Sequence, residues 1–182
     1  TSSNLKSVIL RYFNVAGASP DSTIGELHEP ETDLIPLAIY AALGKKNNLK
    51  VFGNNYDTKD GTCIRDYIHV CDVASAHIKA LKCFSKEHIY FSNKEDENPQ
   101  FKNFHIFNIG NGNGVSVKEI INAVNKISKK SIEVIYSKKR AGDPPKLYAC
   151  SDKIKKELGW EPQFPLIEML IQDAYNWHKK LL

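Results

Sequence analysis

The chain has 182 residues, of which 42% are hydrophobic and 25% are charged, and its formal net charge is +4 with histidine neutral. This is the balance of an ordinary globular domain, and the length allows one substantial core or slightly more. The basic residues are dispersed, whereas a nucleic-acid-binding surface needs one strongly basic face. We therefore expect no nucleic-acid partner, although the modest positive charge would suit a small anionic ligand such as a nucleotide.

The cysteines and the apolar segments indicate the compartment. The four cysteines form no C-x-x-C pair and have no histidine at zinc-ligand spacing, so we expect free thiols, a reducing compartment and no metal site. No apolar run approaches the ~20 residues of a membrane span, and no signal peptide opens the sequence. We expect a cytoplasmic protein without a membrane partner. The sequence enters an apolar strand almost at once, as a piece cut from a longer protein would.

The first half of the chain predicts, in order, a strand, a loop, a helix, two strands and a helix. These elements are expected at 7–15, 20–32, 34–45, 49–53, 65–70 and 73–84. The apolar run SVILRYFNV predicts a single buried strand. Asp33 or Thr32 can cap the first helix, and Asp72 the second.

The second half opens with a polar, charged excursion at 85–103, which we expect to be a mobile surface segment. A strand, a helix, a strand and two more helices follow, expected at 104–110, 116–127, 132–138, 151–160 and 165–182. Ser116 and Glu119 stand at capping-box spacing, and Gly159 is expected to end a helix. Alternating strands and helices predict an α/β fold with parallel pairing.

The glycine-rich stretch GNGNG at 110–114 is a first candidate for binding chemistry. It lacks the tail of a dinucleotide-binding fingerprint, and no acidic residue follows at the expected distance on a second strand. A tight strand-to-helix turn is the favoured interpretation. No catalytic set stands out either: there is no Ser-His-Asp order, no metal cluster and no Tyr-x-x-x-Lys pair in a suitable context.

Residues at the ends of the expected strands are better candidates, because ligands of open α/β sheets bind at loops outside the carboxyl ends of strands. Asn14 follows one strand, and Arg65 and Arg140 stand at loop–strand junctions. Two arginines can grip a diphosphate through paired, charge-assisted hydrogen bonds. Asp143 could accept hydrogen bonds from ribose hydroxyls, and Phe52 could provide an aromatic wall for a base.

A plainer interpretation stays open for the Arg65–Asp66 pair that begins the strand RDYIHV. The two side chains could form a surface ion pair, which contributes little to stability. The residue types alone support this interpretation and the phosphate-binding one equally.

Longer motifs carry a family resemblance. In chain order they are RYFNVAGA, LIPLAIYAALGKK, VFGNNYDTKDGTCIRDYIHVCDVASAH, FNIGNGNGVSV, RAGDPPKLYA and KELGW. They resemble the second half of the UDP-glucose 4-epimerases, which are extended short-chain dehydrogenases/reductases, over nearly the whole chain. The motif RDYIHV-x-D recurs across sugar-nucleotide enzymes, whereas YDTKDGTCIRDYIHV together with RAGDPPKL is narrower and points to the 4-epimerases.

The resemblance implies an α/β fold that joins the last strands of an NAD-binding Rossmann domain to a C-terminal substrate-binding portion. Residues 1–15 would end the Rossmann domain and residues 16–182 would bind the UDP-sugar, with segments such as 65–84 packing back on the Rossmann sheet. The implied cofactor is NAD. The implied partners are the N-terminal NAD-binding half of the same protein and a second copy in a homodimer.

The resemblance also assigns roles to single residues. Tyr12 and Phe13 would lie near the nicotinamide end of NAD, and the other assigned residues would bind the UDP-sugar. These are Asn14 at the diphosphate, Asp33 and Leu34 at the helix start, Lys50, Val51 and Phe52 around uracil, Arg65 and Arg140 on the phosphates, Asp143 on the ribose, and Leu147 beside the C2 substituent of the sugar. Asp33 and Lys50 depart from residues common in the family, so Lys50 would act through its backbone.

The family's reaction moves a hydride from C4 of the sugar to NAD and returns it to the other face of a 4-keto intermediate, within galactose metabolism. The resemblance places the proton-transferring Tyr-x-x-x-Lys pair in the first half of such enzymes, so we expect no catalytic residue in this chain and no activity from it alone. Two alternatives stay open. One is another UDP-sugar epimerase or decarboxylase of the same superfamily, and the other is a non-catalytic nucleotide-sugar-binding module.

Overall fold

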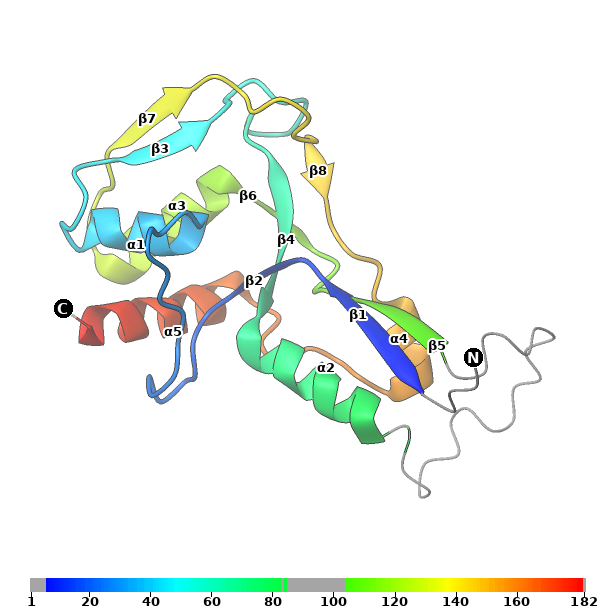
Figure 1. The fold of residues 1–182 in the computed structure, drawn as a ribbon. Helices are drawn as coiled ribbons and strands as arrows, with labels where there is room; N and C mark the ends of the chain where they lie inside the picture. The colour runs from blue at the N-terminus through cyan, green and yellow to red at the C-terminus, as the bar shows by residue number, and fades with distance from the viewer. Residues whose placement is uncertain (1–5, 83, 85–103, 182) are drawn as a thin grey trace.

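The structure, a computed structural model, describes residues 6–82, 84 and 104–181 (Figure 1), and the excursion expected at 85–103 lies outside them. The strands are β1 (Ser7–Tyr12), β2 (Asn14–Ala16), β3 (Leu49–Phe52), β4 (Ile64–His69), β5 (Phe104–Ile109), β6 (Gly114–Ser116), β7 (Val134–Ser137) and β8 (Lys146–Leu147). The helices are α1 (Leu34–Ala42), α2 (Val70–Lys82), α3 (Val117–Ser128), α4 (Asp152–Leu158) and α5 (Ile167–Lys180). Among these described helices, none is long and apolar enough to cross a bilayer.

Strand pairing is mainly parallel, as the alternation of strand and helix patterns predicted. Strand β1 pairs with β5, β3 pairs with β7, and β4 pairs with both β2 and β8, all in parallel. Strand β6 joins β4 in the antiparallel direction. The predicted α/β class with parallel pairing is therefore confirmed.

The apolar run at 7–15 forms two strands, so the expectation of a single strand was wrong. The chain leaves one sheet and enters another at Phe13, because β1 lies against β5 whereas β2 lies against β4. The expected burial was wrong as well, because none of residues 7–15 is buried and Ile9 is 43% exposed. An apolar run also does not show which strands a segment will pair with. The change of partner is therefore invisible in the local sequence.

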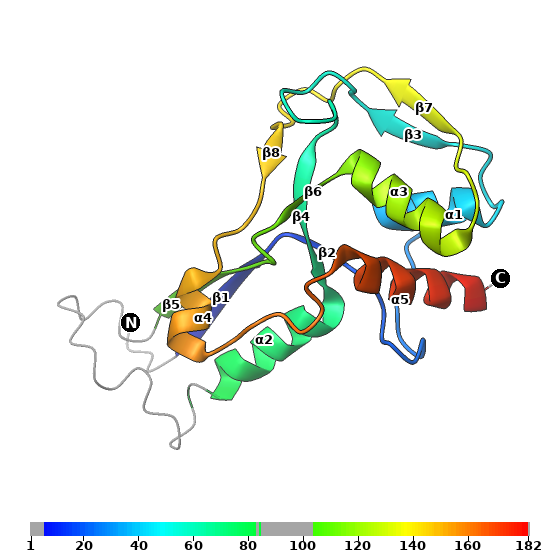
Figure 2. The same ribbon diagram turned by 180° about the vertical axis from the view of Figure 1, so that it is seen from behind.

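The elements enclose two hydrophobic cores (Figures 1 and 2). Helices α1, α3 and α5 pack together around residues such as Ile120, with the β3–β7 pair on one side of them. The second core lies among β1, β5, α2 and α4, where Phe107 and Trp160 are fully buried. Strand β4 runs between the two groups. It contributes Tyr67 to the first core and Ile68 to the second, because successive side chains of a strand face opposite sides.

Helix α2 begins at Val70, so Asp72 lies in its first turn and not at the capping position that we expected. The Asp72 side chain has a different partner. Its carboxylate is buried and accepts hydrogen bonds from the backbone N–H groups of Gln163 (2.7 Å) and Phe164 (3.0 Å). Asp72 therefore holds the segment that leads into α5.

Helix α3 begins with the capping box that its sequence predicted. The Ser116 hydroxyl accepts a hydrogen bond from the Glu119 N–H (3.1 Å), and the Glu119 carboxylate accepts one from the Ser116 N–H (2.7 Å). The same hydroxyl donates to the Asp60 carboxylate at 2.5 Å. The cap thus also ties the loop before β4 to the start of α3.

We expect Ser116→Ala to lower the free energy of unfolding by about 1–2 kcal/mol, because the Glu119 N–H loses its cap and Asp60 loses a donor. Urea unfolding followed by circular dichroism would measure the change. Ser128→Ala is the matched control at the other end of α3, where the Ser128 hydroxyl bonds to the Asn125 carbonyl at 3.5 Å and accepts from the Lys130 N–H at 3.2 Å. Equal destabilisation by the two substitutions would contradict the capping role of Ser116.

Candidate functional site

A network of polar side chains gathers where β4 begins. The Arg65 guanidinium pairs with the Asp143 carboxylate through Nη2 and Oδ1, and the Tyr56 hydroxyl donates to the other carboxylate oxygen at 2.9 Å. Tyr56 is 6% exposed, and burial together with its bond to Asp143 raises its pKa to about 12. The hydroxyl therefore stays protonated and keeps donating. The structure thus brings two of the predicted ligand-binding residues into direct contact.

The predicted aromatic wall carries two cations. The Arg140 guanidinium lies 4.3 Å from the centroid of the Phe52 ring, and the Lys50 ammonium lies 5.2 Å from it. Both distances are in the range of cation–π attraction. Phe52 and the two cations therefore form one charged aromatic surface at the end of β3.

Both arginines contact Asp143: the Arg65 guanidinium pairs with its carboxylate, and the Asp143 N–H donates to the Arg140 carbonyl at 3.4 Å. Burial raises the pKa of Cys63, the guanidinium of Arg65 lowers it, the carboxylate of Asp143 raises it further, and Arg140 lowers it. Charges act on a partly buried group mainly over short distances, because solvent and salt screen the longer ones. Arg65 and Arg140 each contact Asp143, one through its side chain and one through its backbone, so the three residues lie in one region.

A cavity of about 510 Å³ lies beside this surface. Its walls include Lys50 and Phe52 of β3, Arg140, and Glu31 and Thr32 from the loop before α1. The volume is within the range of small-molecule pockets. An aromatic ring flanked by two cations suits a ligand that has both an aromatic base and negative charge.

A second cavity, of about 550 Å³, has mainly apolar walls. Ala16 of β2 and Val70 and Ala74 of α2 line it, and Asp33 is also among its lining residues. Because Asp33 directly follows Thr32, the loop before α1 borders both cavities.

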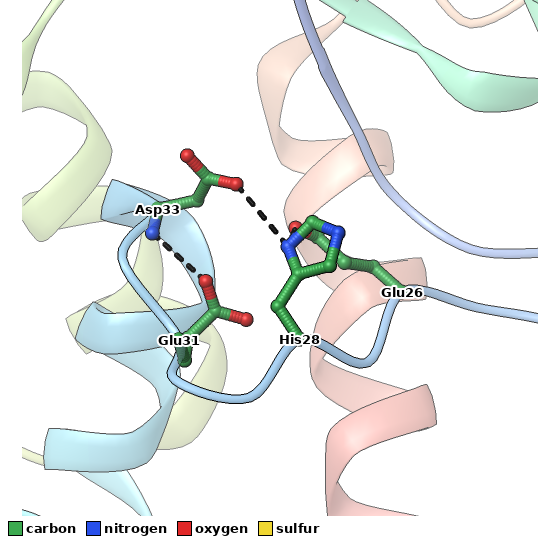
Figure 3. Close-up of side chains that lie close together, drawn as sticks. All are labelled: Glu26, His28, Glu31 and Asp33. Atoms are coloured by element: carbon green, nitrogen blue, oxygen red, sulfur yellow. Dashed lines mark hydrogen bonds and ion pairs between the residues drawn. The ribbon is translucent and has the colours of Figure 1, made fainter.

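Four ionisable side chains gather in this loop (Figure 3). Glu26, His28, Glu31 and Asp33 each offer one ligand atom, and these atoms lie within 4.8 Å of one another. His28 Nδ1 is 2.9 Å from a Glu26 carboxylate oxygen and 3.6 Å from one of Asp33, and Glu31 accepts from the Asp33 N–H at 2.8 Å. His28 and Asp33 are exposed, and exposed acidic groups commonly gather without an ion. The cluster alone therefore assigns no metal site.

Asp33 occupies the predicted N-cap position of α1, but its carboxylate turns to His28 and not to the helix backbone. Leu34 begins the helix, as expected, and packs partly against the first core. Both residues lie next to the loop that borders the two cavities.

The other residues predicted near a ligand differ in accessibility. Tyr12 ends β1 with 52% of its surface exposed, Phe13 is half-buried at the break between strands, and Asn14 begins β2 and is exposed. Val51 is 3% exposed and packs in the first core, so its backbone is what it can offer to a ligand. Leu147 in β8 is 48% exposed.

Asp66 does not form the surface ion pair with Arg65 that the sequence left open. It is fully buried, and its carboxylate accepts hydrogen bonds at 3.0 Å from the backbone N–H groups of Asn111, Gly112 and Ala149. Adjacent side chains of a strand point to opposite sides, so Arg65 and Asp66 serve different partners. The surface-pair interpretation was therefore wrong.

The same bonds account for the GNGNG stretch. Two backbone N–H groups of this turn, which a phosphate would need, already bond to the carboxylate of Asp66. A Cβ atom at Gly110 would collide with that carboxylate, so the glycine allows a close approach. These contacts support the interpretation of GNGNG as a tight turn.

Two Tyr-x-x-x-Lys spacings occur in the sequence, and the one that lies within the described residues does not have the setting of a catalytic pair. Tyr175 and Lys179 lie on α5, where Tyr175 packs against the first core and Lys179 is exposed. Neither residue is among those that line the two cavities. The other pair, Tyr90 and Lys94, lies outside the described residues.

Comparison with known proteins places the chain in a family. The sequence model of the GDP-mannose 4,6 dehydratase family matches residues 1–173. The chain belongs to this family. The chain is 46% identical over 176 residues to the UDP-glucose 4-epimerase of Rhizobium meliloti. The aligned residues cover 97% of this chain and 49% of that protein.

Solved structures agree with this family assignment. A crystal structure of a UDP-glucose 4-epimerase matches with a TM-score of 0.86 and 46% identity, over 98% of this chain and 50% of that one. The enzyme of Bifidobacterium longum, solved with NAD+ and UDP, matches with a TM-score of 0.81 and 34% identity, over 95% of this chain and 47% of that one. The resemblance read from the motifs is confirmed. The chain spans about half the length of the relatives it matches.

Sequence reasoning missed Tyr56, although it lies in the distinctive stretch YDTKDGT. A tyrosine in a polar loop gives no sign that it is buried or that its partner is Asp143. The glycine at position 53 was one local signal. It adopts φ +86°, and a Cβ atom there would press into the Tyr56 ring. The glycine thus leaves room for this ring.

The cluster at Glu26 predicts a pH dependence. Burial, followed by the neighbouring Asp33 and Glu31, raises the pKa of Glu26 from 4.5 to about 7. The folded state therefore holds this proton more tightly than the unfolded state, so the contribution of Glu26 to stability is complete below pH ~4.5 and is lost as the pH rises through about 7.

We therefore expect Glu26→Gln to raise the thermal midpoint at pH 8 more than at pH 5. The Glu26 carbonyl accepts from Trp177 Nε1 at 2.8 Å, so Trp177 fluorescence would report locally on the docking of this loop. Glu29→Gln, an exposed position in the same loop, is the matched control. A shift for Glu26→Gln that is the same at both pH values would contradict the prediction.

Proposed function

We propose that this chain is the C-terminal, substrate-binding half of an NAD-dependent UDP-glucose 4-epimerase, which interconverts UDP-glucose and UDP-galactose through a 4-keto intermediate. The observation that carries the proposal is the Arg65–Asp143 pair beside the charged Phe52 surface, in a chain 46% identical to a named UDP-glucose 4-epimerase. The solved relative from Bifidobacterium longum was crystallised with NAD+ and UDP, so the ligand class has direct precedent in the family.

In the proposed complex the charged groups of the site would hold the nucleotide. The Arg65 guanidinium donates hydrogen bonds to Asp143 and to the Ile64 carbonyl. Its remaining N–H donors would bind the diphosphate. Arg140 would bind the diphosphate from the other side. Asp143 would accept from the ribose, and Phe52 would stack near uracil, with the Lys50 backbone beside it.

The residues at the end of β1 support NAD as the cofactor. Tyr12 is 52% exposed at the carboxyl end of this parallel strand, which is where α/β sheets bind nucleotides. Tyr12 and Phe13 would contact the cofactor there, and Asn14 would reach the diphosphate of the substrate from the start of β2. NAD would supply hydride acceptance and return at C4 of the sugar. The residues of this chain would bind and orient the substrate.

The two cores support a division between two domains. We assign β1, with residues up to about 15, to the end of the NAD-binding domain, and the rest of the chain to substrate binding. The second core joins β1 to α2, β5 and α4, so segments such as 65–84 would return to the NAD-binding domain. As part of the same proposal, an N-terminal NAD-binding half would complete the protein. The protein would form a homodimer and would be located in the cytoplasm.

Arg65→Lys in the intact protein tests the phosphate contact. We expect UDP affinity to fall about ten- to a hundred-fold, or ~1.5–3 kcal/mol, because an ammonium cannot reproduce the forked hydrogen bonds of a guanidinium. Titration calorimetry with UDP would measure the loss. Arg11→Lys, an exposed arginine of β1, is the matched control. Unchanged UDP affinity in Arg65→Lys would refute the assignment.

Residues 1–182 expressed alone should turn over no UDP-galactose, because the proposed hydride carrier and proton-transferring tyrosine belong to the other half. A coupled assay of purified protein, prepared from a host that lacks its own epimerase, would measure this. The intact protein should be active in the same assay. Turnover by residues 1–182 alone would show that this half contains its own catalytic groups.

A further inference from the structure

The segment between β2 and α1, residues 17–33, forms part of both cavities, and we call it the cavity loop. Gly25 and Glu26 are among the residues that line the apolar cavity, and Glu31 and Thr32 line the charged one. A loop of this length with no helix or strand of its own is uncommon in a compact domain and is usually functional. Whatever fixes the cavity loop therefore shapes both cavities.

The cavity loop is not held by burial of its own large side chains, because Ile24 and Leu27 are 74% and 67% exposed. The Ser19 hydroxyl accepts from the N–H groups of Thr23 and Ile24 at 3.0 and 2.9 Å, which closes a turn inside the loop. This turn does not attach the loop to the rest of the protein. Ordering a loop costs backbone entropy at every residue, so contacts with another element have to offset that cost.

Helix α5 supplies such contacts where the cavity loop passes beside it (Figures 1 and 2). Trp177 Nε1 donates to the Glu26 carbonyl at 2.8 Å, and Lys180 Nζ donates to the Ser22 carbonyl at 2.9 Å. Gly25 lies directly on the indole, because a Cβ atom there would stand 2.5 Å from three ring atoms of Trp177. Trp177 thus holds the loop by a hydrogen bond and by close packing, and it is not among the residues that line either cavity.

We propose that Trp177 is a positioning residue for the nucleotide, which holds the cavity loop where it completes the binding cavity without itself contacting the ligand. The inference rests on the proposed function, in which the charged cavity takes the UDP part of the substrate. The apparent affinity of a protein for its ligand is reduced by the fraction of molecules whose binding surface is not formed. Without Trp177 the loop would leave its position in most molecules, and UDP would bind more weakly although every residue assigned to UDP is still present.

The UDP affinity of the intact protein tests the inference. Trp177→Ala removes the hydrogen bond and the indole surface together. We expect the dissociation constant for UDP, measured by titration calorimetry, to rise about tenfold, which corresponds to a loop in place in about a tenth of the molecules. Unchanged UDP affinity, in a variant that circular dichroism shows to be folded, would overturn the inference.

A second variant acts on the same contact from the side of the loop. Gly25→Ala places a methyl group against the indole, so it should weaken UDP binding about five- to tenfold. In the Trp177→Ala background the ring is gone, and Gly25→Ala should then change UDP affinity by less than about twofold, because the two residues share one contact. If the two effects simply multiply, Gly25→Ala does not act through Trp177 and the inference is overturned.

Trp160→Phe is the matched control. Trp160 also donates Nε1 to a backbone carbonyl, that of Asp72 at 3.2 Å, but it is fully buried in the second core and is not among the residues that line either cavity. Its replacement should lower the thermal midpoint and leave UDP affinity within about twofold of the original. An equal loss of UDP affinity in Trp160→Phe and Trp177→Ala would show that general loosening is the cause, and would overturn the inference.

Hydrogen exchange of the unmodified intact protein decides if Trp177→Ala does not fold. If docking of the cavity loop strengthens UDP binding, UDP must strengthen docking by the same factor. UDP should therefore slow amide exchange at 178–181, next to Trp177, although these residues are not among those that line the cavities. No change there at saturating UDP would overturn the inference. Failure of the proposed function is recognised separately, because the unmodified intact protein would then bind no UDP in the calorimeter.

Discussion

Strand β4 is the element on which the rest of the structure depends, because it sends successive side chains to opposite sides. Arg65 meets Asp143 on one side, and Asp66 meets the turn after β5 on the other. The next two residues repeat the alternation in apolar form, with Tyr67 in the first core and Ile68 in the second. One short strand thus joins both cores and the candidate ligand site.

His69, at the other end of β4, is also held by hydrogen bonds. The Cys71 N–H donates to Nδ1 of His69 at 3.1 Å, so the proton of the neutral ring is on Nε2, which faces Asp173 of α5 at 3.3 Å. Burial lowers the pKa of His69, although Asp173 opposes the shift, and we assign the ring a structural role. The Cβ of any other residue at Gly17 would press on this ring, which explains the glycine after β2.

The side chains of the candidate site hold one another in place. Both carboxylate oxygens of Asp143 are already engaged, one by Arg65 and one by Tyr56. This fixes the side chains that the proposed function assigns to the phosphates and the ribose. Binding then requires less ordering of rotamers, which is the general advantage of a preorganised site. The conformational entropy of these side chains is lost during folding, where burial of the Tyr56 ring and the pairing of β4 offset the loss.

The order of family motifs, the α/β class and several helix ends could be determined from the sequence by itself. The capping box of Ser116 and Glu119 and the left-handed Gly159 after α4 were predicted correctly because their partners lie within one helical turn. The arginines, Asp143 and Phe52 were identified as site candidates from residue type and strand position.

The tertiary structure alone decided the partners of the buried charges. The contacts of Arg65 with Asp143, of Asp66 with Ala149 and of Asp72 with Phe164 span 78, 83 and 92 residues. No local pattern encodes a partner at that distance, which is why the sequence left a surface ion pair open for Asp66 and predicted a helix cap for Asp72. The break of the first apolar run at Phe13 has the same cause. Local sequence sets the conformation of a segment, whereas its neighbours are set by how the whole chain packs.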